Sequence, residues 1–311
     1  MAKIVTITNP ITGQPAQVDQ LDHTAQQIDD GLNIARGVSN PNLLDNWYFA
    51  NPVNQRGQTS YTGEGYGIDR YRAYADGTIL ITDQGIQLIG LCYWGQPFIA
   101  KSKGFLPGRK FTFSALVDKP GAVFHLWSTS LGGFLITEGS YDNGLVTITF
   151  TVPSGVLPND EIRITANNSA GANPAFCGMK LELGSQQTLA HKGENGNWVL
   201  NEIPDYGEQL ARCQRYHFEF GPSHALIAYD GYGVNSPVVY FPVQMRTVSA
   251  IKVYSKAGTE NAITYWNGSA EVDFTDFILE WNENFVVLRS NGKFTQGGIY
   301  TVGKLIAYAD L

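Results

Sequence analysis

The chain has 311 residues, of which 43% are hydrophobic, 16% charged and 12% aromatic, with 34 glycines and 14 prolines. A formal charge of −7 offers no positive field to nucleic acid, and no apolar run approaches the ~18 residues that cross a bilayer, so neither partner is expected. The low charged fraction and the many glycines favour a mainly β protein with two domains over a helical enzyme.

Residues 1–40 predict an extended arm followed by a coiled-coil helix. The alternating KIVTIT run lies in an arm, residues 1–17, that must pair with something to become ordered, either by docking into a larger assembly or by folding back on its own subunit. Apolar residues then recur every three or four positions, as at the a and d positions of a coiled coil: Val18, Leu21, Ala25, Ile28, Leu32 and Ala35. This stripe favours self-association, with three strands as the preferred number, and the alternative is one amphipathic helix lying on its own domain.

Residues 41–188 predict a β-sandwich of jelly-roll type. Short alternating segments, including KFTFSALV, AVFHLW and DEIRITA, are separated by Gly, Pro, Asn and Asp. In LVTITFTV, Val146, Ile148 and Phe150 share one face while threonines take the other, as in a sheet with one buried face.

A polar segment, residues 189–215, is interpreted as a linker with a connecting helix of about two turns around Leu210. Residues 216–311 predict a second, smaller all-β domain, also a jelly-roll-like β-sandwich. Within it, Asn267-Gly268 indicates a two-residue hairpin turn, because a type I′ turn needs positive φ at both positions.

No catalytic motif, metal-binding spacing or phosphate-binding loop is present, so we expect no cofactor, no metal and no catalytic residue. Cys92, Cys177 and Cys213 are odd in number and widely spaced, which favours reduced, buried thiols.

The carboxylate pairs near turns or in the first helix are expected to be solvated. They are Asp29-Asp30, Asp160-Glu161, Asp273 with Asp276, and Glu280 with Glu283. A polysaccharide-degrading enzyme stays a weak alternative, because a catalytic carboxylate pair can be assembled from residues far apart in sequence.

Strand alternation in the segment RYHFEF places Arg215, His217 and Glu219 on one face. We interpret this face as a hydrogen-bonded surface row rather than a metal or catalytic site.

Aromatic residues beside turns are the strongest candidates for ligand contact. Flat rings suit the apolar face of a sugar, and neighbouring Asn, Asp and Gln side chains can bind its hydroxyl groups. The candidate rings are Tyr93, Trp94, Tyr229, Tyr232, Tyr265 and Trp266.

Several longer motifs resemble those of fibre and appendage proteins of bacteriophages and prophages. The motifs are NPNLLDNWYFANPVNQRGQ, YGIDRYRAY, CGMKLELGS, PDYGEQLARCQRYH, YFPVQMRTVSAIKVYS and the final IAYADL, and together they span roughly Asn40 to Leu311.

This resemblance implies a homotrimeric virion protein, made in the bacterial cytoplasm, with an N-terminal segment that attaches to the portal, collar, capsid or tail. It also implies β-domains that bind host cell-surface polysaccharide. The short coiled coil favours a compact fibre over a long tail-fibre shaft. A structural head-fibre or decoration protein without sugar specificity is the alternative function.

Overall fold

The computed structural model describes residues 40–137, 140–168, 171–221, 224–228, 236–290, 294–295 and 297–309. The arm and the coiled-coil stripe expected before Asn40, and the candidate rings Tyr229 and Tyr232, lie outside these residues. The described chain is mainly β, as predicted, and within it no helix has both the length and the apolar character needed to span a bilayer.

The strands of the first β-region begin at Ser60. They are β1 (Ser60–Thr62), β2 (Gly65–Tyr66), β3 (Arg72–Ala73), β4 (Thr78–Thr82), β5 (Gly85–Ile89), β6 (Trp94–Ile99), β7 (Lys110–Val117), β8 (Ala122–Ser128), β9 (Gly133–Thr137), β10 (Ser140–Asp142), β11 (Leu145–Thr151), β12 (Glu161–Asn168) and β13 (Ala175–Leu183). A short 3-10 helix, η1 (Ala100–Lys103), follows β6.

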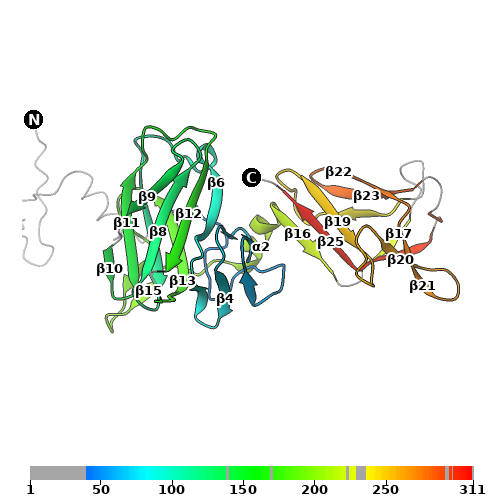
Figure 1. Cartoon of the computed structure of the whole chain (residues 1–311), viewed down its shortest axis with the longest axis horizontal. Helices are drawn as coiled ribbons and strands as arrows, with labels where there is room; N and C mark the ends of the chain where they lie inside the picture. The colour runs from blue at the N-terminus through cyan, green and yellow to red at the C-terminus, as the bar shows by residue number, and fades with distance from the viewer. Residues whose placement is uncertain are drawn as a thin grey trace, which may run out of the picture. The chain divides into compact units, whose positions relative to one another are not determined.

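These strands form two antiparallel sheets with jelly-roll topology (Figure 1). One sheet has the order β1-β4-β5-β13-β7-β11-β10, and the other has the order β2-β3-β6-β12-β8-β9. The chain crosses repeatedly from one sheet to the other. As a result, strands β5-β13-β7-β11 of the first sheet face strands β6-β12-β8-β9 of the second. This is the strand order of a jelly roll, which consists of two Greek keys. The predicted jelly-roll-like sandwich is therefore confirmed.

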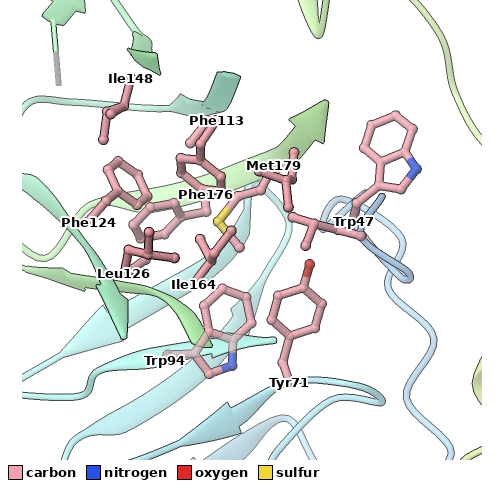
Figure 2. Packing of buried hydrophobic residues seen from close by; sticks show 14 of the residues in the cluster. Trp47, Tyr71, Trp94, Phe113, Phe124, Leu126, Ile148, Ile164, Phe176 and Met179 are labelled. Atoms are coloured by element: carbon pink, nitrogen blue, oxygen red, sulfur yellow. The ribbon is translucent and has the colours of Figure 1, made fainter. Parts of the chain in front are cut away.

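Aromatic side chains fill the space between these sheets (Figure 2). Phe113 on β7 packs against Phe124 on β8 with ring centroids 4.7 Å apart. On β11, Val146 and Ile148 are buried while Thr149 is exposed, as the alternation predicts.

The segment after β13 continues the first core instead of leaving it. Leu189 and Ala190 are buried in that core, and Ala190 begins a hairpin of β14 (Ala190–Lys192) and β15 (Trp198–Leu200). The predicted connecting helix is present as α2 (Tyr206–Gln214), capped by the Asp205 side chain, which accepts a hydrogen bond from the Glu208 N–H.

A buried ion pair ties this segment to the CGMKLELGS motif. The side chains of Lys180 and Glu182 are both 0% exposed, with Nζ 4.0 Å from the carboxylate. Glu182 accepts hydrogen bonds from the Thr188 N–H and hydroxyl, at 2.7 and 2.5 Å. Lys180 also lies 3.6 Å from Glu202. The motif therefore fastens residues 188–202 to the sandwich.

The last β-region has its own core. Its strands are β16 (His217–Phe220), β17 (His224–Ile227), β18 (Val238–Tyr240), β19 (Ala250–Tyr254), β20 (Ile263–Trp266), β21 (Glu271–Phe274), β22 (Ile278–Trp281), β23 (Phe285–Arg289), β24 (Ile299–Val302) and β25 (Lys304–Tyr308). They form the antiparallel sheets β16-β25-β19, β17-β24-β20-β21 and β18-β23-β22, so this region is β-rich as predicted but lacks the two-sheet strand order of a jelly roll in its described residues. Val253, Ile263, Leu288 and Leu305 are among the fully buried residues of this core.

The hairpin predicted at Asn267-Gly268 exists, but its predicted turn type is wrong. Trp266 pairs with Glu271, so the loop has four residues, and Gly268 has positive φ (100°) while Asn267 does not. The Asn267 carboxamide oxygen accepts hydrogen bonds from the N–H groups of Ser269 and Ala270, which stabilises the longer loop.

Candidate functional site

A cavity of about 350 Å³ has walls rich in arginine and tyrosine. Its volume falls in the range of small-molecule sites. The residues that line it are Arg56, Tyr66, Arg70, Arg72, Glu161, Tyr216, His217, Tyr308 and Ala309. They come from the first β-region, from the segment after α2 that leads into β16, and from β25 and the residue after it, so no local stretch of sequence contains the site.

Arg70 forms a rigid part of the wall because it is held on two sides. Its Nε lies 3.3 Å from the buried Asp45 carboxylate, and its guanidinium carbon lies 3.4 Å from the centre of the Tyr216 ring. This stacking fixes the Tyr216 ring beside the cavity. Lys103 also approaches Asp45, at 3.8 Å, so the local negative charge is shared between two cations.

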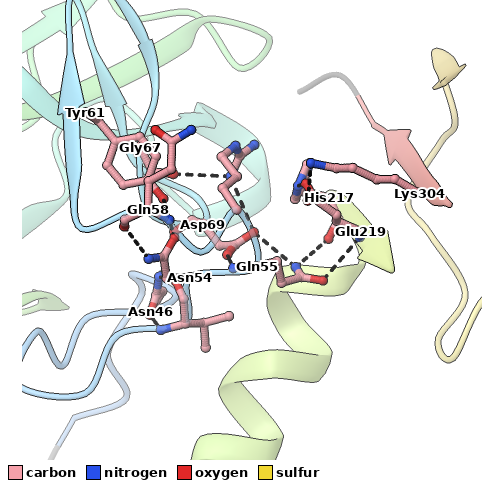
Figure 3. A network of polar contacts seen from close by, with 12 residues as sticks. Asn46, Asn54, Gln55, Gln58, Tyr61, Gly67, Asp69, His217, Glu219 and Lys304 are labelled. Carbon is pink, nitrogen blue, oxygen red and sulfur yellow. Dashed lines mark hydrogen bonds and ion pairs between the residues drawn. The ribbon is translucent and has the colours of Figure 1, made fainter. Parts of the chain in front are cut away.

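Gln55 links the wall to the final β-region (Figure 3). Its side-chain amide donates to Asp69 Oδ1 at 3.0 Å and to the His217 carbonyl at 2.7 Å, and its N–H donates to Asp69 Oδ2. Burial raises the pKa of Asp69, although the His217 charge, the Gln55 donors and Arg56 act in the opposite direction. Arg56 lies 3.6 Å from the same carboxylate.

The interpretation of His217 as part of a surface row is wrong. His217 is 5% exposed, and neither ring nitrogen has a hydrogen-bond partner among the described residues. Its ring packs against Tyr308, and Nε2 lies 3.5 Å from Glu219. The strand pairs with β25 and also contacts Gln55, so the face that alternation marks as polar is covered.

Arginines and aromatic rings alternate outward from the cavity across one sheet of the sandwich. The Arg72 guanidinium carbon lies 6.0 Å from the Tyr66 ring centre and 5.2 Å from that of Tyr74. The corresponding carbon of Arg163 lies 4.4 Å from the Tyr74 ring centre and 4.0 Å from that of Trp127. Such contacts are each worth about 0.5–2 kcal/mol, so the row is held in place.

Strand pairing puts this row on the outer face of the sheet. Arg72 pairs with Tyr66 and Gly95, and Arg163 pairs with Trp127. Directly paired residues share a face, whereas the buried Trp94 beside Gly95 faces the core. From β2 to β8 the row crosses four strand spacings, about 19 Å at ~4.8 Å each.

Tyr93 is the one candidate ring of the sequence analysis that joins this face among the described residues. It packs edge-on against His125, which lies two residues from Trp127 on β8 and so points to the same side. We call this surface the aromatic face. Its members are Tyr66, Arg72, Tyr74, Tyr93, His125, Trp127 and Arg163.

The hydroxyl groups of Tyr66, Tyr74 and Tyr308 stay protonated at neutral pH. Burial raises the pKa of Tyr66, Tyr74 and Tyr308, and it outweighs the opposing charges of nearby arginines and lysines. Each phenol can therefore donate as well as accept a hydrogen bond. The Tyr74 hydroxyl and the Arg72 Nε are buried without a hydrogen-bond partner in the described part of the chain.

The other predicted rings have different surroundings. The prediction that Trp94 contacts a sugar is wrong. Its side chain is 0% exposed and stacks on Tyr71 inside the core, with the two ring centroids 4.6 Å apart. Tyr265 is half-buried and packs against Phe274 and Tyr300. Trp266 is 62% exposed at the hairpin tip, and so keeps a ring face available.

The other residues considered for catalysis or metal binding have structural roles in the described part of the chain. Asp160 is buried rather than solvated, and accepts hydrogen bonds from the Ser128 and Ser130 hydroxyls and the Leu157 N–H. All three cysteines are free thiols, with Cys92 and Cys213 buried and Cys177 half-buried. No cluster of His, Cys, Asp and Glu suited to a metal ion occurs in the part of the chain described.

The motifs that carry the phage-fibre resemblance meet at the cavity. NPVNQRGQ supplies Arg56, YGIDRYRAY supplies Arg72, LARCQRYH supplies Tyr216, and IAYADL supplies Tyr308. Sequence reasoning missed this site because it sought rings beside turns, whereas the signal was the set of Arg and Tyr residues that these motifs carry between them.

No protein-family model and no curated protein matches the chain. Among solved structures, the chain is similar to the N-terminal CBM22-1–CBM22-2 tandem domain of Xyn10C from Paenibacillus barcinonensis. The two are 11% identical over 87% of this chain and 98% of that one, with a TM-score of 0.28. A similarity of this size assigns no function to the chain.

Proposed function

We propose that this protein binds bacterial cell-surface polysaccharide along the aromatic face and in the adjoining cavity, as a non-enzymatic appendage of a bacteriophage particle. The observation that carries the binding proposal is the row of rings and guanidinium groups that leads into the cavity. Rings offer apolar surface to sugar carbons, and guanidinium and phenol groups donate hydrogen bonds to hydroxyls.

A face about 19 Å across suits a chain of sugars better than one isolated molecule. The cavity would hold one residue of the polymer, and the rings from Tyr74 to Trp127 would support its neighbours. The arginines are already fixed by stacking, so little side-chain entropy is lost when the ligand binds.

Binding without cleavage is favoured by the carboxylate chemistry of this site. Hydrolysis of a glycosidic bond ordinarily uses two carboxyl groups, one of which must hold a proton. Among the described residues that line the cavity, the one carboxylate is that of Glu161, which lies 2.6 Å from Arg163 Nε. The described wall therefore lacks the second carboxyl group that this chemistry ordinarily needs.

The binding proposal is tested by comparing two tyrosines of similar exposure. Tyr66 is 39% exposed and lines the cavity, whereas Tyr141 is 42% exposed and lies on β10 of the other sheet. Tyr66→Ala should weaken binding to a responsive glycan, identified on a glycan array, at least fivefold, about 1 kcal/mol, while Tyr141→Ala leaves it unchanged. Equal effects of the two variants would contradict the proposed site.

The alternative of a structural fibre without sugar specificity makes a different prediction on the same array. It predicts that the full-length protein retains no glycan although it binds the virus particle. Release of reducing sugar from host envelope polysaccharide, abolished by one carboxylate substitution, would instead establish an enzyme.

Trimer formation and virion attachment are proposals about residues 1–37. We propose that the stripe from Val18 to Ala35 associates three chains, and that three weak sites then gain roughly 10² to 10⁴ in avidity. Deletion of residues 1–37 should give folded monomers that bind cells far more weakly. An unchanged trimer mass by light scattering would overturn this role.

A further inference from the structure

Arg72 differs from the other cations of the cavity in its charge balance. Arg56 lies 3.6 Å from Asp69, and Arg70 lies 3.3 Å from Asp45. Glu161, the carboxylate in the wall, is neutralised by Arg163. Among the described residues, Arg72 has no carboxylate within 4.0 Å, so its positive charge is uncompensated in the wall of a cavity.

The geometry of Arg72 leaves its guanidinium group suited to an anion. The rings of Tyr66 and Tyr74 contact it, and strand pairing with Tyr66 and Gly95 fixes its backbone. A Cβ at position 95 would lie 2.0 Å from the Ile164 carbonyl oxygen, so glycine is required there and no side chain rises opposite Arg72. A planar guanidinium group held in this way matches the paired oxygens of a carboxylate or phosphate.

We propose that this cavity selects saccharides bearing an anionic group, a carboxylate or a phosphate, and that Arg72 binds that group. The inference rests on the polysaccharide-binding function proposed above and adds the charge of the ligand to it. Tyr66 would contact the sugar ring while Arg72 binds the anionic substituent.

The overall charge of −7 is compatible with an acidic ligand. Charges exposed to solvent are largely screened beyond the Debye length, ~8 Å at physiological ionic strength, so the groups around the cavity dominate. Those groups are three arginines with their partners, and the excess charge is that of Arg72. Binding should therefore weaken as salt is added.

The test uses the full-length protein on an array of neutral, uronic-acid, sialic-acid and phosphate-bearing glycans. The strongest acidic glycan is then compared with its neutral derivative: the methyl ester of a carboxylate, or the dephosphorylated form of a phosphate. We expect acidic glycans to dominate, and neutralisation to weaken binding roughly 10- to 100-fold, the value of a charged hydrogen bond. The two acidic classes on the array distinguish the carboxylate from the phosphate source.

Three variants assign the effect to one side chain. Arg72→Gln should reproduce the 10- to 100-fold loss for the acidic glycan and leave its neutral derivative unaffected. Arg72→Lys, which keeps the charge but not the planar group, should lose less. Arg109→Gln is the matched control, because Arg109 is exposed and lies outside the cavity. Circular dichroism melting verifies that each variant is folded.

The outcomes separate this inference from the function on which it rests. Preferential binding of neutral glycans, or an acidic glycan that binds Arg72→Gln as tightly as the native chain, overturns the anion inference alone. Failure to retain any glycan overturns the proposed function, and the inference with it.

Discussion

Substitution of Lys180 by methionine should leave the fully buried Glu182 carboxylate without the cation 4.0 Å from it. Methionine retains an unbranched apolar side chain of similar length, so the substitution removes mainly the charge. Glu182 keeps two hydrogen bonds from Thr188, whereas its electrostatic compensation is lost.

The expected loss in the free energy of unfolding is about 3 kcal/mol. Breaking a buried ion pair costs about 3–5 kcal/mol, and the lower end applies because the Thr188 donors remain. At ~2–4 °C per kcal/mol for a protein of this size, the melting temperature should fall by about 6–12 °C.

The effect should also depend on pH in a defined direction. Burial raises the pKa of Glu182, while Thr188 and Lys180 lower it, so removal of Lys180 lets the pKa rise further. A raised pKa in the folded state favours folding below the unfolded pKa, ~4.3, and this contribution is lost as the pH rises through the folded pKa. The penalty should therefore be larger at pH 7 than at pH 4.5.

Urea unfolding followed by circular dichroism at both pH values measures this penalty. The double variant Lys180→Met with Glu182→Gln is the control, because it removes both charges and should recover at least ~1 kcal/mol. A loss below ~1 kcal/mol for Lys180→Met at pH 7, or an equal loss at both pH values, would refute the reasoning.

Gln55→Ala should lower the free energy of unfolding, measured by thermal melts, by about 1–3 kcal/mol, because the Asp69 carboxylate and the His217 carbonyl lose a hydrogen-bond donor. A change no larger than that of the exposed Gln58→Ala would contradict this. Burial alone would raise the pKa of Asp160, but its serine and backbone hydrogen bonds hold it below the ordinary value. The ionised form of Asp160 therefore stabilises the folded state above the unfolded pKa, ~3.9, and this stabilisation is lost as the pH falls through the folded pKa. The urea midpoint of Asp160→Asn should for this reason fall less in acid than that of the native chain. Trp266→Ala should change stability by no more than ~0.5 kcal/mol and reduce retention on polysaccharide beads, and unchanged retention would remove Trp266 from the proposed contacts.

Alternation in the sequence predicts the sandwich well because a sheet with one buried face repeats every two residues. Val146 and Ile148 follow this rule. The rule fails where a second element covers the polar side of a strand. His217 is covered by Gln55, 162 positions away, and Lys180 by the segment after its strand that contains Glu202; alternation contains no information about such cover.

The candidate site was predictable in its chemistry but not in its location. Tyr93 and Trp94 are adjacent, yet one lies on the aromatic face and the other is in the core. Tyr93 precedes β6 with a positive φ of 35°, which a pattern of alternating residues does not predict, whereas Trp94 begins the strand. The cavity brings together Arg56 and Tyr308, 252 positions apart, and only the folded chain shows that they share a wall.

The mixed origin of the cavity wall has a thermodynamic consequence. A ligand that contacts both Arg72 and Tyr308 binds only when the C-terminal strand β25 is packed where the structure has it. By linkage, such a ligand at 100 times its dissociation constant would add about 2.7 kcal/mol against the loss of that packing. A bound ligand of this kind would thus join β25 to the first β-region more firmly than they are joined in the free chain.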